Sequence, residues 1–469
     1  MNYLKIIFPL IDHLYIFQLF EYQNQRFFNW YMKYPLKRNL QRKHSFEPTP
    51  KSLLILIISL SLILPVCFGS YLLFESYWVV ILNGLICFYL SPLFLILANL
   101  ILKPLDLYSR NKIITLAKQK RKELKDLVVV AIVGSFAKTS TKNILYTLLW
   151  KDFYVVKTPK SYNTELSVAR SLIRDTKSTT QIFIAEMDAY YQGEIDKLCQ
   201  IVRPNYGVIT AIAAQHLERF SDMDQLANTQ FEIAKHISNG FLFLNSNDEW
   251  SMKLKDAYDT NKVIYGKSTD EFYISQINQK ESGLEFYLHQ GQKKIAIKLP
   301  LQGEHNAYNF LAAASIAKRL GLNLEKIAKR ASLVLPTEHR LEIKQYGNIT
   351  LIDNSFNANA TSYKSSFKLL REYPGKQKII ITPGLVEIGT DSGEIHQQLA
   401  IDATLAADQI IIVGENAREE LLSGIRETKF SKDDLFLVET TNQALDLLKR
   451  IAKPQAVVLI ENDLPDQYF

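Results

Sequence analysis

Two long uncharged runs near the N-terminus restrict the fold more than any other feature of the chain. One covers residues 52–74 and the other residues 78–102, and the whole region 52–102 contains a single charge, Glu75. A helix needs about 20 residues to cross the hydrocarbon core of a bilayer. Soluble helices of this length keep a polar stripe, which both runs lack. We therefore predict a two-helix transmembrane hairpin over residues 52–102, with a pair of buried helices as the alternative.

The basic residues of the chain are concentrated on both sides of this hairpin. Residues 1–51 and residues 103–127 each contain eight basic and three acidic side chains, so residues 1–127 carry a net charge of +9 and the remainder carries −2, against +7 overall. By the positive-inside rule, basic flanks and a short loop place both ends of the hairpin in the cytoplasm. The charge therefore indicates topology at a cell membrane with anionic lipid, and we expect no nucleic acid partner. The position of the hairpin, starting at residue 52, excludes a cleavable signal peptide.

Segments 1–51 and 103–126 flank the predicted hairpin. The first mixes aromatic and basic side chains and is expected to lie on the membrane surface as an interfacial segment, or to form an extra packing helix. The second is a basic connector. Three cysteines without a Cys-x-x-Cys pair, and eight histidines without a His-x-x-x-His pair, give no support for a disulfide framework or a zinc hydrolase.

After residue 127, short β-branched runs alternate with helical stretches. Five predicted strands lie at 127–134, 182–187, 206–210, 240–245 and 262–266, and four more lie at 349–353, 378–384, 409–414 and 456–461. Such alternation predicts parallel strands joined by crossover helices. The expected fold class is α/β, with a central domain over 127–335 and a Rossmann-like C-terminal domain over 336–469.

The first of these strands leads into the loop GSFAKTST, residues 134–141. A strand, a loop of small residues, and Lys and Thr at a helix start suit a nucleotide triphosphate. Backbone N–H groups face the phosphates, Lys138 neutralises their charge, and the Thr139 hydroxyl can bind Mg²⁺. Ala137 stands where a glycine is usual, so the loop by itself leaves an ordinary strand-to-helix turn equally open.

The segments that follow resemble the Mur ligase family, and most of all its MurF branch. They are TPKSYNTELS (158–167), IFIAEMDAYYQGEI (182–195), RPNYGVITAIAAQHLERF (203–220), GEHNAYNFLAAASIA (303–317), EHRLE (338–342) and LIDNSFNANATS (351–362), in the family's order. The resemblance covers about residues 127–465. It implies a P-loop central domain and an enzyme that uses ATP and Mg²⁺ to form an acyl phosphate and then an amide in peptidoglycan precursor synthesis.

The resemblance also implies roles for individual residues. The catalytic residues would be Lys138, Glu186, His216 and Arg340, and the metal ligands Thr139, Glu186 and His216. The nucleotide would contact Gly134, Ser135, Lys138, Thr139, Ser140, His305, Asn306, Asn309, Arg340 and Asp353. The substrate would contact Asn163, Thr164, Ser355, Asn357 and Asn359. Structural alternatives exist, because a strand-end Glu is often solvated, a loop His is often a satisfied polar group, and Asn often caps a helix.

Four features depart from the family pattern. Ala137 would cost about 1–2 kcal/mol if its position needs a positive φ. Gln230 stands where several Mur ligases have a carbamylated lysine that binds a second magnesium. Residues 1–127 replace the usual UDP-binding domain, and ENDLPD (461–466) lacks the family's Lys-Gly-Ser turn. The acceptor, a cell-wall precursor peptide, is therefore either UDP-linked or lipid-linked, and the amine is an amino acid or dipeptide.

A membrane-anchored amide ligase of this type is the leading hypothesis. Two alternatives remain: a ligase similar to poly-γ-glutamate synthase, and an ATP-binding scaffold that has lost catalysis.

Overall fold

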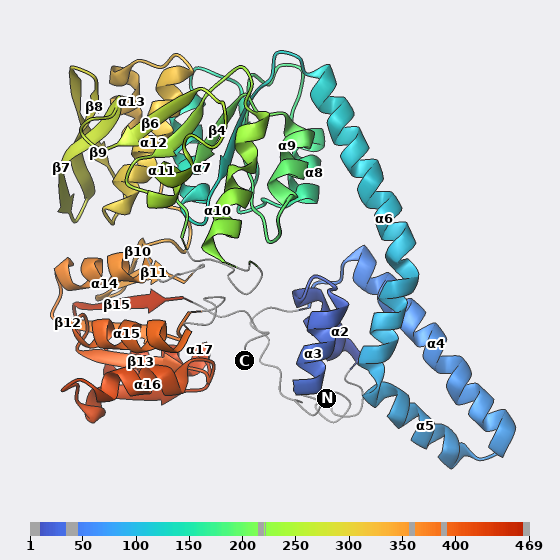
Figure 1. The fold of residues 1–469 in the computed structure, drawn as a ribbon. Coiled ribbons are helices and arrows are strands. Elements are labelled where there is room, and N and C mark those ends of the chain that lie inside the picture. The colour runs from blue at the N-terminus through green and yellow to red at the C-terminus, as the bar shows by residue number, and fades with distance from the viewer. Residues whose placement is uncertain are drawn as a thin grey trace. The chain divides into compact units, whose positions relative to one another are not determined.

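The computed structural model describes residues 10–33, 46–213, 220, 222–355, 362–385 and 392–462 (Figure 1). The chain forms two compact units. The first contains the helices that precede residue 112, and the second contains the two β-sheets.

The first unit is helical. Its elements are α2 (Leu10–Leu19), α3 (Asn24–Lys33), α4 (Pro50–Phe74), α5 (Tyr77–Tyr89) and the first two thirds of α6 (Ser91–Glu123). By length and composition, α4 and α6 could each cross a membrane, whereas α5 is a shorter apolar helix of 13 residues. The first predicted apolar run is thus one helix, and the second run is divided between α5 and α6.

The division of the second run has a local cause. The N–H of Leu90 bonds to the carbonyl of Ile86, and α6 then begins at Ser91. Pro92 has no N–H to continue the helical hydrogen bonds, and its ring disfavours helical backbone at the preceding residue. Near this break, the carbonyl of Tyr89 accepts a hydrogen bond from the Tyr31 hydroxyl at 3.2 Å.

Helices α2 and α3 pack on α4 and α6. Their apolar side chains share one core with Ile55, Leu95, Ala98 and Leu102. His13 of α2 lies 2.7 Å from the Ser91 hydroxyl, at the start of α6. The expected basic connector, residues 103–126, is mostly helical because α6 continues to Glu123.

The first sheet has nine strands in the order β2-β3-β1-β4-β5-β6-β7-β8-β9. They are β1 (Val128–Val133), β2 (Val155–Lys157), β3 (Ile182–Glu186), β4 (Tyr206–Ile209), β5 (Leu242–Asn245), β6 (Lys262–Gly266), β7 (Phe272–Lys280), β8 (Gly283–Gln290) and β9 (Lys293–Leu299). Neighbours are parallel from β2 to β7, and β7, β8 and β9 are antiparallel.

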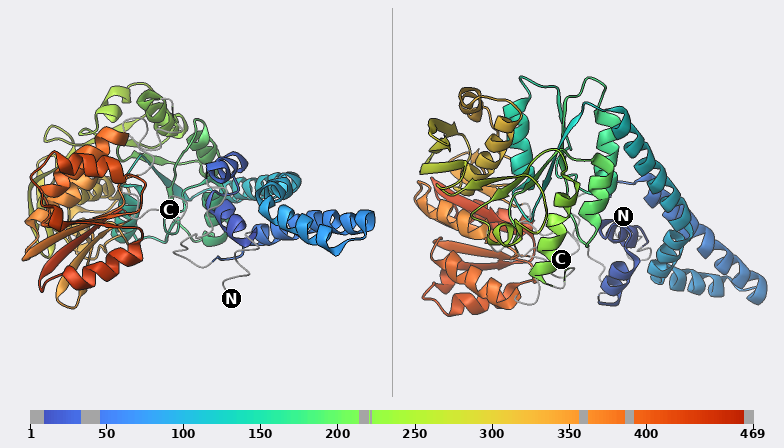
Figure 2. Two further views of the ribbon diagram at one scale, coloured as in Figure 1. Left: turned by 90° about the horizontal axis from the view of Figure 1, so that it is seen from below. Right: turned by 45° about the horizontal axis from the view of Figure 1, so that its top comes forward.

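Helices cover both faces of this sheet (Figure 2). One face packs against α7 (Lys138–Leu149), α12 (His305–Arg319) and α13 (Leu324–Ala331), and the other against α8 (Glu165–Asp175), α9 (Glu194–Val202), α10 (Met223–Phe231) and the short helix η1 (Glu232–His236). The short helix α11 (Glu249–Leu254) follows β5. Because both faces are buried, the central strands are apolar throughout.

The second sheet has six strands in the order β10-β11-β15-β12-β13-β14. They are β10 (Glu342–Tyr346), β11 (Ile349–Asn354), β12 (Gln377–Thr382), β13 (Gln409–Val413), β14 (Leu435–Val438) and β15 (Ala456–Glu461). The helices are α14 (Ser362–Glu372), α15 (Ser392–Thr404), α16 (Arg418–Arg426), η2 (Lys432–Asp434) and α17 (Thr441–Ile451). Among the described strands of this sheet, only β10 is antiparallel to its neighbour. The predicted α/β class is confirmed.

Candidate active site

Three hydrogen bonds fix the loop between β1 and α7 to neighbouring segments of the fold. Gly134 donates its N–H to Oε1 of Gln230 at 2.9 Å, and Ser135 donates its N–H to the carbonyl of Ala211 at 2.8 Å. The hydroxyl of Thr210 donates to the carbonyl of Phe136 at 2.5 Å. The loop is therefore held in one shape at the start of a helix, where free backbone N–H groups favour anions.

Ala137 ends this loop in a left-handed conformation, with φ 68° and ψ −7°. The position thus needs the positive φ that a glycine adopts without cost. Gln230, the second departure from the family pattern, is buried and commits its side-chain oxygen to the loop.

Lys138 begins α7 and turns back over the loop. Its ammonium lies 3.0 Å from Oδ2 of Asp188 and donates to the carbonyls of Gly134 and Ser135 at 2.5 and 3.3 Å. Ser140, one residue beyond Thr139, is buried in the same helical turn. The lysine is thus positioned next to the loop where phosphates would lie, and its charge is balanced by a carboxylate.

Glu186 lies at the carboxyl end of β3, the strand next to β1, and its side chain is 1% exposed. Oε1 accepts hydrogen bonds from the Thr139 hydroxyl at 3.0 Å and from Nδ2 of Asn163 at 3.3 Å. Oε2 is 2.8 Å from the ammonium of Lys142. Three predicted residues, Thr139, Asn163 and Glu186, therefore meet at the point where α/β sheets bind ligands.

Arg340 belongs to the same charged group. Its N–H bonds to the carbonyl of Thr337 at 3.1 Å, in the segment that precedes β10. Burial lowers the pKa of the Arg340 guanidinium, and the carboxylates of Glu186 and Asp188 act in the opposite direction. The arginine thus lies within electrostatic reach of the strand-end carboxylates.

A cavity of about 550 Å³ adjoins the loop. His305 and Asn309 of α12 line it together with Ala137, and the aromatic side chains of Trp250, Tyr265 and Tyr308 supply flat apolar surface; the other lining residues are Phe136, Thr141, Thr210, Ala211, Ile212, Ala213, Met223, Asn245, Asn247, Asp248, Glu249 and Ala312. This cavity suits a nucleobase because aromatic faces can stack on a planar ring.

The three α12 residues of the predicted nucleotide site differ in their surroundings. Burial lowers the pKa of His305 to about 4, with a smaller contribution from Arg340, so the imidazole is neutral at pH 7. Its Nδ1 is buried without a hydrogen-bond partner among the described residues. Asn306 instead donates to the carbonyl of Gln302 at 2.7 Å and accepts from Asn309 at 2.9 Å. Asn306 therefore shapes the start of α12 rather than lining the cavity.

Asp353 lies near the end of β11 in a network of donors. It accepts hydrogen bonds from the Ser355 hydroxyl at 2.7 Å and interacts with His339 at 2.8 Å and Lys344 at 3.1 Å. Burial opposes ionisation, but these partners outweigh it and hold the pKa of Asp353 below its usual value. His339, Asp353 and Glu342 could geometrically hold a metal ion, but the Lys344 ammonium bridges the two carboxylates.

Of the remaining predicted residues, Thr164 is the one that lies in the described part of the chain. Thr164 precedes α8 and bonds to Ser167 in a helix cap, which is a structural role. His216, Asn357 and Asn359 lie outside the described residues. Sequence reasoning missed Lys142 and Asp188, although Lys142 is one helical turn from Lys138 and Asp188 comes two residues after Glu186.

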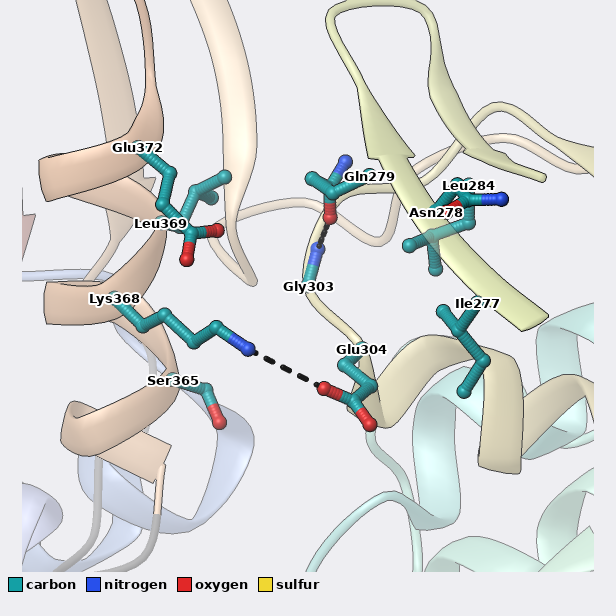
Figure 3. A pocket seen from close by; sticks show the side chains of 10 residues that line it. All are labelled: Ile277, Asn278, Gln279, Leu284, Gly303, Glu304, Ser365, Lys368, Leu369 and Glu372. Carbon is teal, nitrogen blue, oxygen red and sulfur yellow. Dashed lines mark hydrogen bonds and ion pairs between the residues drawn. The ribbon is translucent and has the colours of Figure 1, made fainter. Parts of the chain in front are cut away.

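A second cavity, of about 360 Å³, lies between β7, β8, the start of α12 and α14 (Figure 3). The ammonium of Lys368 faces Glu304 across it at 3.5 Å. None of the predicted site residues within the described ranges lines this cavity, so it stands apart from the charged group around Glu186.

A loop of small residues at a helix start, a strand-end carboxylate and an arginine from the following segment suit a nucleotide-dependent α/β enzyme. Residues 132–317 match the Mur ligase middle domain, and residues 339–461 match the Mur ligase glutamate ligase domain. The chain belongs to the Mur ligase family and is an ATP-dependent ligase that forms an amide bond.

Named relatives agree with this assignment. The UDP-N-acetylmuramoyl-tripeptide–D-alanyl-D-alanine ligase of Escherichia coli K12 is 29% identical over 307 residues, which are 64% of this chain and 67% of that enzyme. The enzyme of the same name from Bacillus subtilis is 27% identical over 285 residues, 60% of this chain and 61% of that enzyme. The chain therefore matches about two thirds of the length of these relatives.

Solved structures of MurF enzymes are similar to this chain in fold. MurF from Acinetobacter baumannii has a TM-score of 0.69 and 26% identity, and the match covers 76% of this chain and 77% of that one. MurF ligase from Thermotoga maritima in complex with ADP shares the fold, with a TM-score of 0.65, 24% identity, and coverage of 75% of this chain and 80% of that one.

Proposed function

We propose that the chain is a membrane-anchored ligase of the MurF type, which joins an amino acid or dipeptide to the peptide of a peptidoglycan precursor. The group formed by Lys138, Thr139, Glu186, Asp188 and Arg340 carries this proposal. It places three cations or donors beside two carboxylates at the start of a helix. This arrangement suits a reaction that brings a carboxylate and a polyphosphate together.

The nucleotide site follows from the geometry of the loop and the adjoining cavity. The phosphates of ATP would lie against the N–H groups at the start of α7, with Lys138 beside them. The base would lie in the 550 Å³ cavity, between Trp250, Tyr308 and the neutral imidazole of His305. Ala137 lines both regions, so one short loop would fix the phosphates and the base together.

Oxygen donors near the phosphates fit a magnesium ion. The Thr139 hydroxyl and Oε1 of Glu186 lie 3.0 Å apart, and hydroxyl, carboxylate and phosphate oxygens are the ligands that Mg²⁺ prefers. Asp188, whose Oδ2 is 3.5 Å from Nδ2 of Asn163, adds a third oxygen donor nearby. When bound, the ion would neutralise phosphate charge during transfer. The proposed participation of His216 rests on the family resemblance.

The chain's own residues supply the remaining electrostatics. A substrate carboxylate attacks the γ-phosphorus of ATP, ADP leaves, and an acyl phosphate forms; the amine nitrogen then attacks the acyl carbon and phosphate leaves. Lys138 and Arg340 would stabilise the negative charge that spreads over the transferred group. Asn163 would orient the acceptor, because it is hydrogen-bonded to Glu186 and its carbonyl accepts from Asp188.

The substrate assignment rests on the relatives. Two of them are named for a UDP-muramoyl tripeptide and D-alanyl-D-alanine, and we propose the same chemical classes here. In this chain the helical first unit stands where the family resemblance predicts a UDP-binding domain. We therefore propose that the acceptor is carried either by UDP or by a membrane lipid. Ser355, hydrogen-bonded to Asp353, and the predicted positions Asn357 and Asn359 would face that acceptor.

The same helical unit supports membrane anchoring. Helix α4 has 25 residues, and the apolar parts of α5 and α6 together provide a second leg of similar length. Large apolar side chains, among them Leu64, Phe68, Leu72, Leu82 and Ile86, are exposed on these helices. Lipid would cover them, and the basic flanks would keep the catalytic unit in the cytoplasm.

The test is phosphate release by the full chain in detergent micelles or vesicles. With ATP, Mg²⁺, precursor tripeptide and D-alanyl-D-alanine, the wild-type chain should release phosphate, and Lys138→Ala should abolish the release. Lys151→Ala, which removes an exposed lysine after α7, is the matched control and should behave as wild type. Measurable ATP binding without release would favour the scaffold, and release with glutamate alone would favour the polymer synthase. Recovery of the chain in the soluble fraction after alkaline extraction would contradict the anchor.

A further inference from the structure

Lys142 is a buried cation whose role the nucleotide site does not require. It lies on α7, one turn after Lys138, and its side chain is 0% exposed. The ammonium is 2.8 Å from Oε2 of Glu186 and also donates to the backbone carbonyl of Lys160. One side chain therefore joins the carboxyl end of β3 to the loop formed by residues 158–164.

The two oxygens of Glu186 have different partners. Oε1 accepts from Thr139 and Asn163, on the side of the phosphate loop, and Oε2 faces Lys142. A charge-assisted contact of this length is strong and restricts rotation of the carboxylate. Lys142 therefore presents Oε1 towards Thr139 and holds Oε2 away from it.

The loop on the other side of Lys142 is shaped to meet it. Lys160 has a φ of 45°, which places its backbone in the left-handed region that is unfavourable for residues other than glycine. The resulting turn directs the Lys160 carbonyl at the Lys142 ammonium. The loop also contacts β3 and the residues that follow it, because the Thr158 hydroxyl accepts from the N–H of Glu186 and the Asn163 carbonyl accepts from the N–H of Asp188.

We propose that Lys142 is a positioning residue that couples nucleotide binding to the order of the 158–164 loop. Any ligand that fixes Glu186 also fixes Lys142, and Lys142 holds the loop that carries Asn163. By thermodynamic reciprocity, a substrate that orders this loop would strengthen nucleotide binding by the same factor. The coupling to nucleotide binding rests on the proposed nucleotide site. The contact between Lys142 and the loop is independent of that proposal.

Hydrogen exchange of the peptide that covers residues 158–164 tests the proposal in the full chain, with and without Mg²⁺ and ADP. In the wild type, the ligand should slow exchange in this loop. Lys142→Met keeps the length of the side chain but removes its ammonium. It should speed exchange in the ligand-free loop by at least about tenfold, as expected for loss of a charged hydrogen bond, and remove the response to ADP.

Lys157→Met is the matched control. It removes a neighbouring partly buried ammonium that donates to Asn143 and not to Glu186 or Lys160, so the loop should still respond to ADP. Because Lys142→Met removes the cation that faces a buried carboxylate, the double variant Lys142→Met/Glu186→Gln, which keeps the net charge of the site unchanged, is used if the single variant fails to fold. In that variant the loop should still exchange faster than in Glu186→Gln alone.

The outcomes distinguish a failure of the positioning role of Lys142 from a failure of the proposed function. A chain with Lys142→Met whose loop exchanges as in the wild type, and still responds to ADP, would overturn the positioning role. If the wild-type chain does not bind ADP by calorimetry, the proposed function and the coupling both fail.

Discussion

The left-handed backbone at Ala137 lowers the stability of the catalytic unit, and a glycine at this position should restore part of that stability. A left-handed conformation costs a residue with a Cβ atom about 1–2 kcal/mol, and Ala137 has a φ of 68°. Glycine removes that cost but loses about 0.5–1 kcal/mol through the greater freedom of the unfolded chain. Ala137→Gly should therefore increase the free energy of unfolding of the catalytic unit by up to about 1.5 kcal/mol.

Urea denaturation in detergent micelles, followed by tryptophan fluorescence, measures this change. Ala328→Gly is the matched control because Ala328 lies inside α13, where glycine should cost about 1 kcal/mol. The two substitutions are chemically identical, and their effects should have opposite signs. If Ala137→Gly destabilises the chain as much as Ala328→Gly does, the left-handed strain is not present and the reasoning is wrong.

Three further substitutions have defined outcomes. Gln230→Leu should lower the free energy of unfolding by about 1–3 kcal/mol in urea denaturation, since the Gly134 N–H loses its buried acceptor; an unchanged midpoint would contradict this. Burial raises the pKa of Glu461 from 4.5 to about 7, so the free energy of unfolding of the wild type should fall by up to about 3 kcal/mol as pH rises from 4.5 through 7. Glu461→Gln should lack this fall, and parallel pH profiles of denaturation for the two chains would refute the prediction. Trp250→Phe should remove any change in tryptophan fluorescence on ADP binding, and persistence of the full signal would place the base elsewhere.

The central strands could be predicted from sequence because burial on both faces makes them short, apolar and β-branched. Strands β2, β10 and β14 were not predicted, and neither were strands β7, β8 and β9. The latter three are antiparallel, and several of their side chains are exposed, so they lack the continuous apolar signal of buried strands. The break at Leu90 was also missed, because the run remains apolar on both sides and only Pro92 marks it.

The site could be predicted in part. Lys138, Thr139, Glu186 and Asn163 occur in recognisable segments, and the structure places them within hydrogen-bonding distance of one another or of a shared partner. Lys142 gave no signal, since a lysine inside a helix is normally exposed. The aromatic lining of the cavity also gave none, because Trp250, Tyr265 and Tyr308 come from separate segments that only the fold brings together.

The mass of the product formed by the full chain tests the proposed ligase activity most directly. With ATP, Mg²⁺, the UDP-muramoyl tripeptide or its lipid-linked form, and D-alanyl-D-alanine, one of the two acceptors should gain the mass of the dipeptide less one water. One ADP should appear for each amide bond, and Lys138→Ala should give neither product. ADP formation without a ligated peptide from either acceptor, or no product despite ADP binding, would contradict the assignment of this chain as an amide ligase acting on cell-wall precursors.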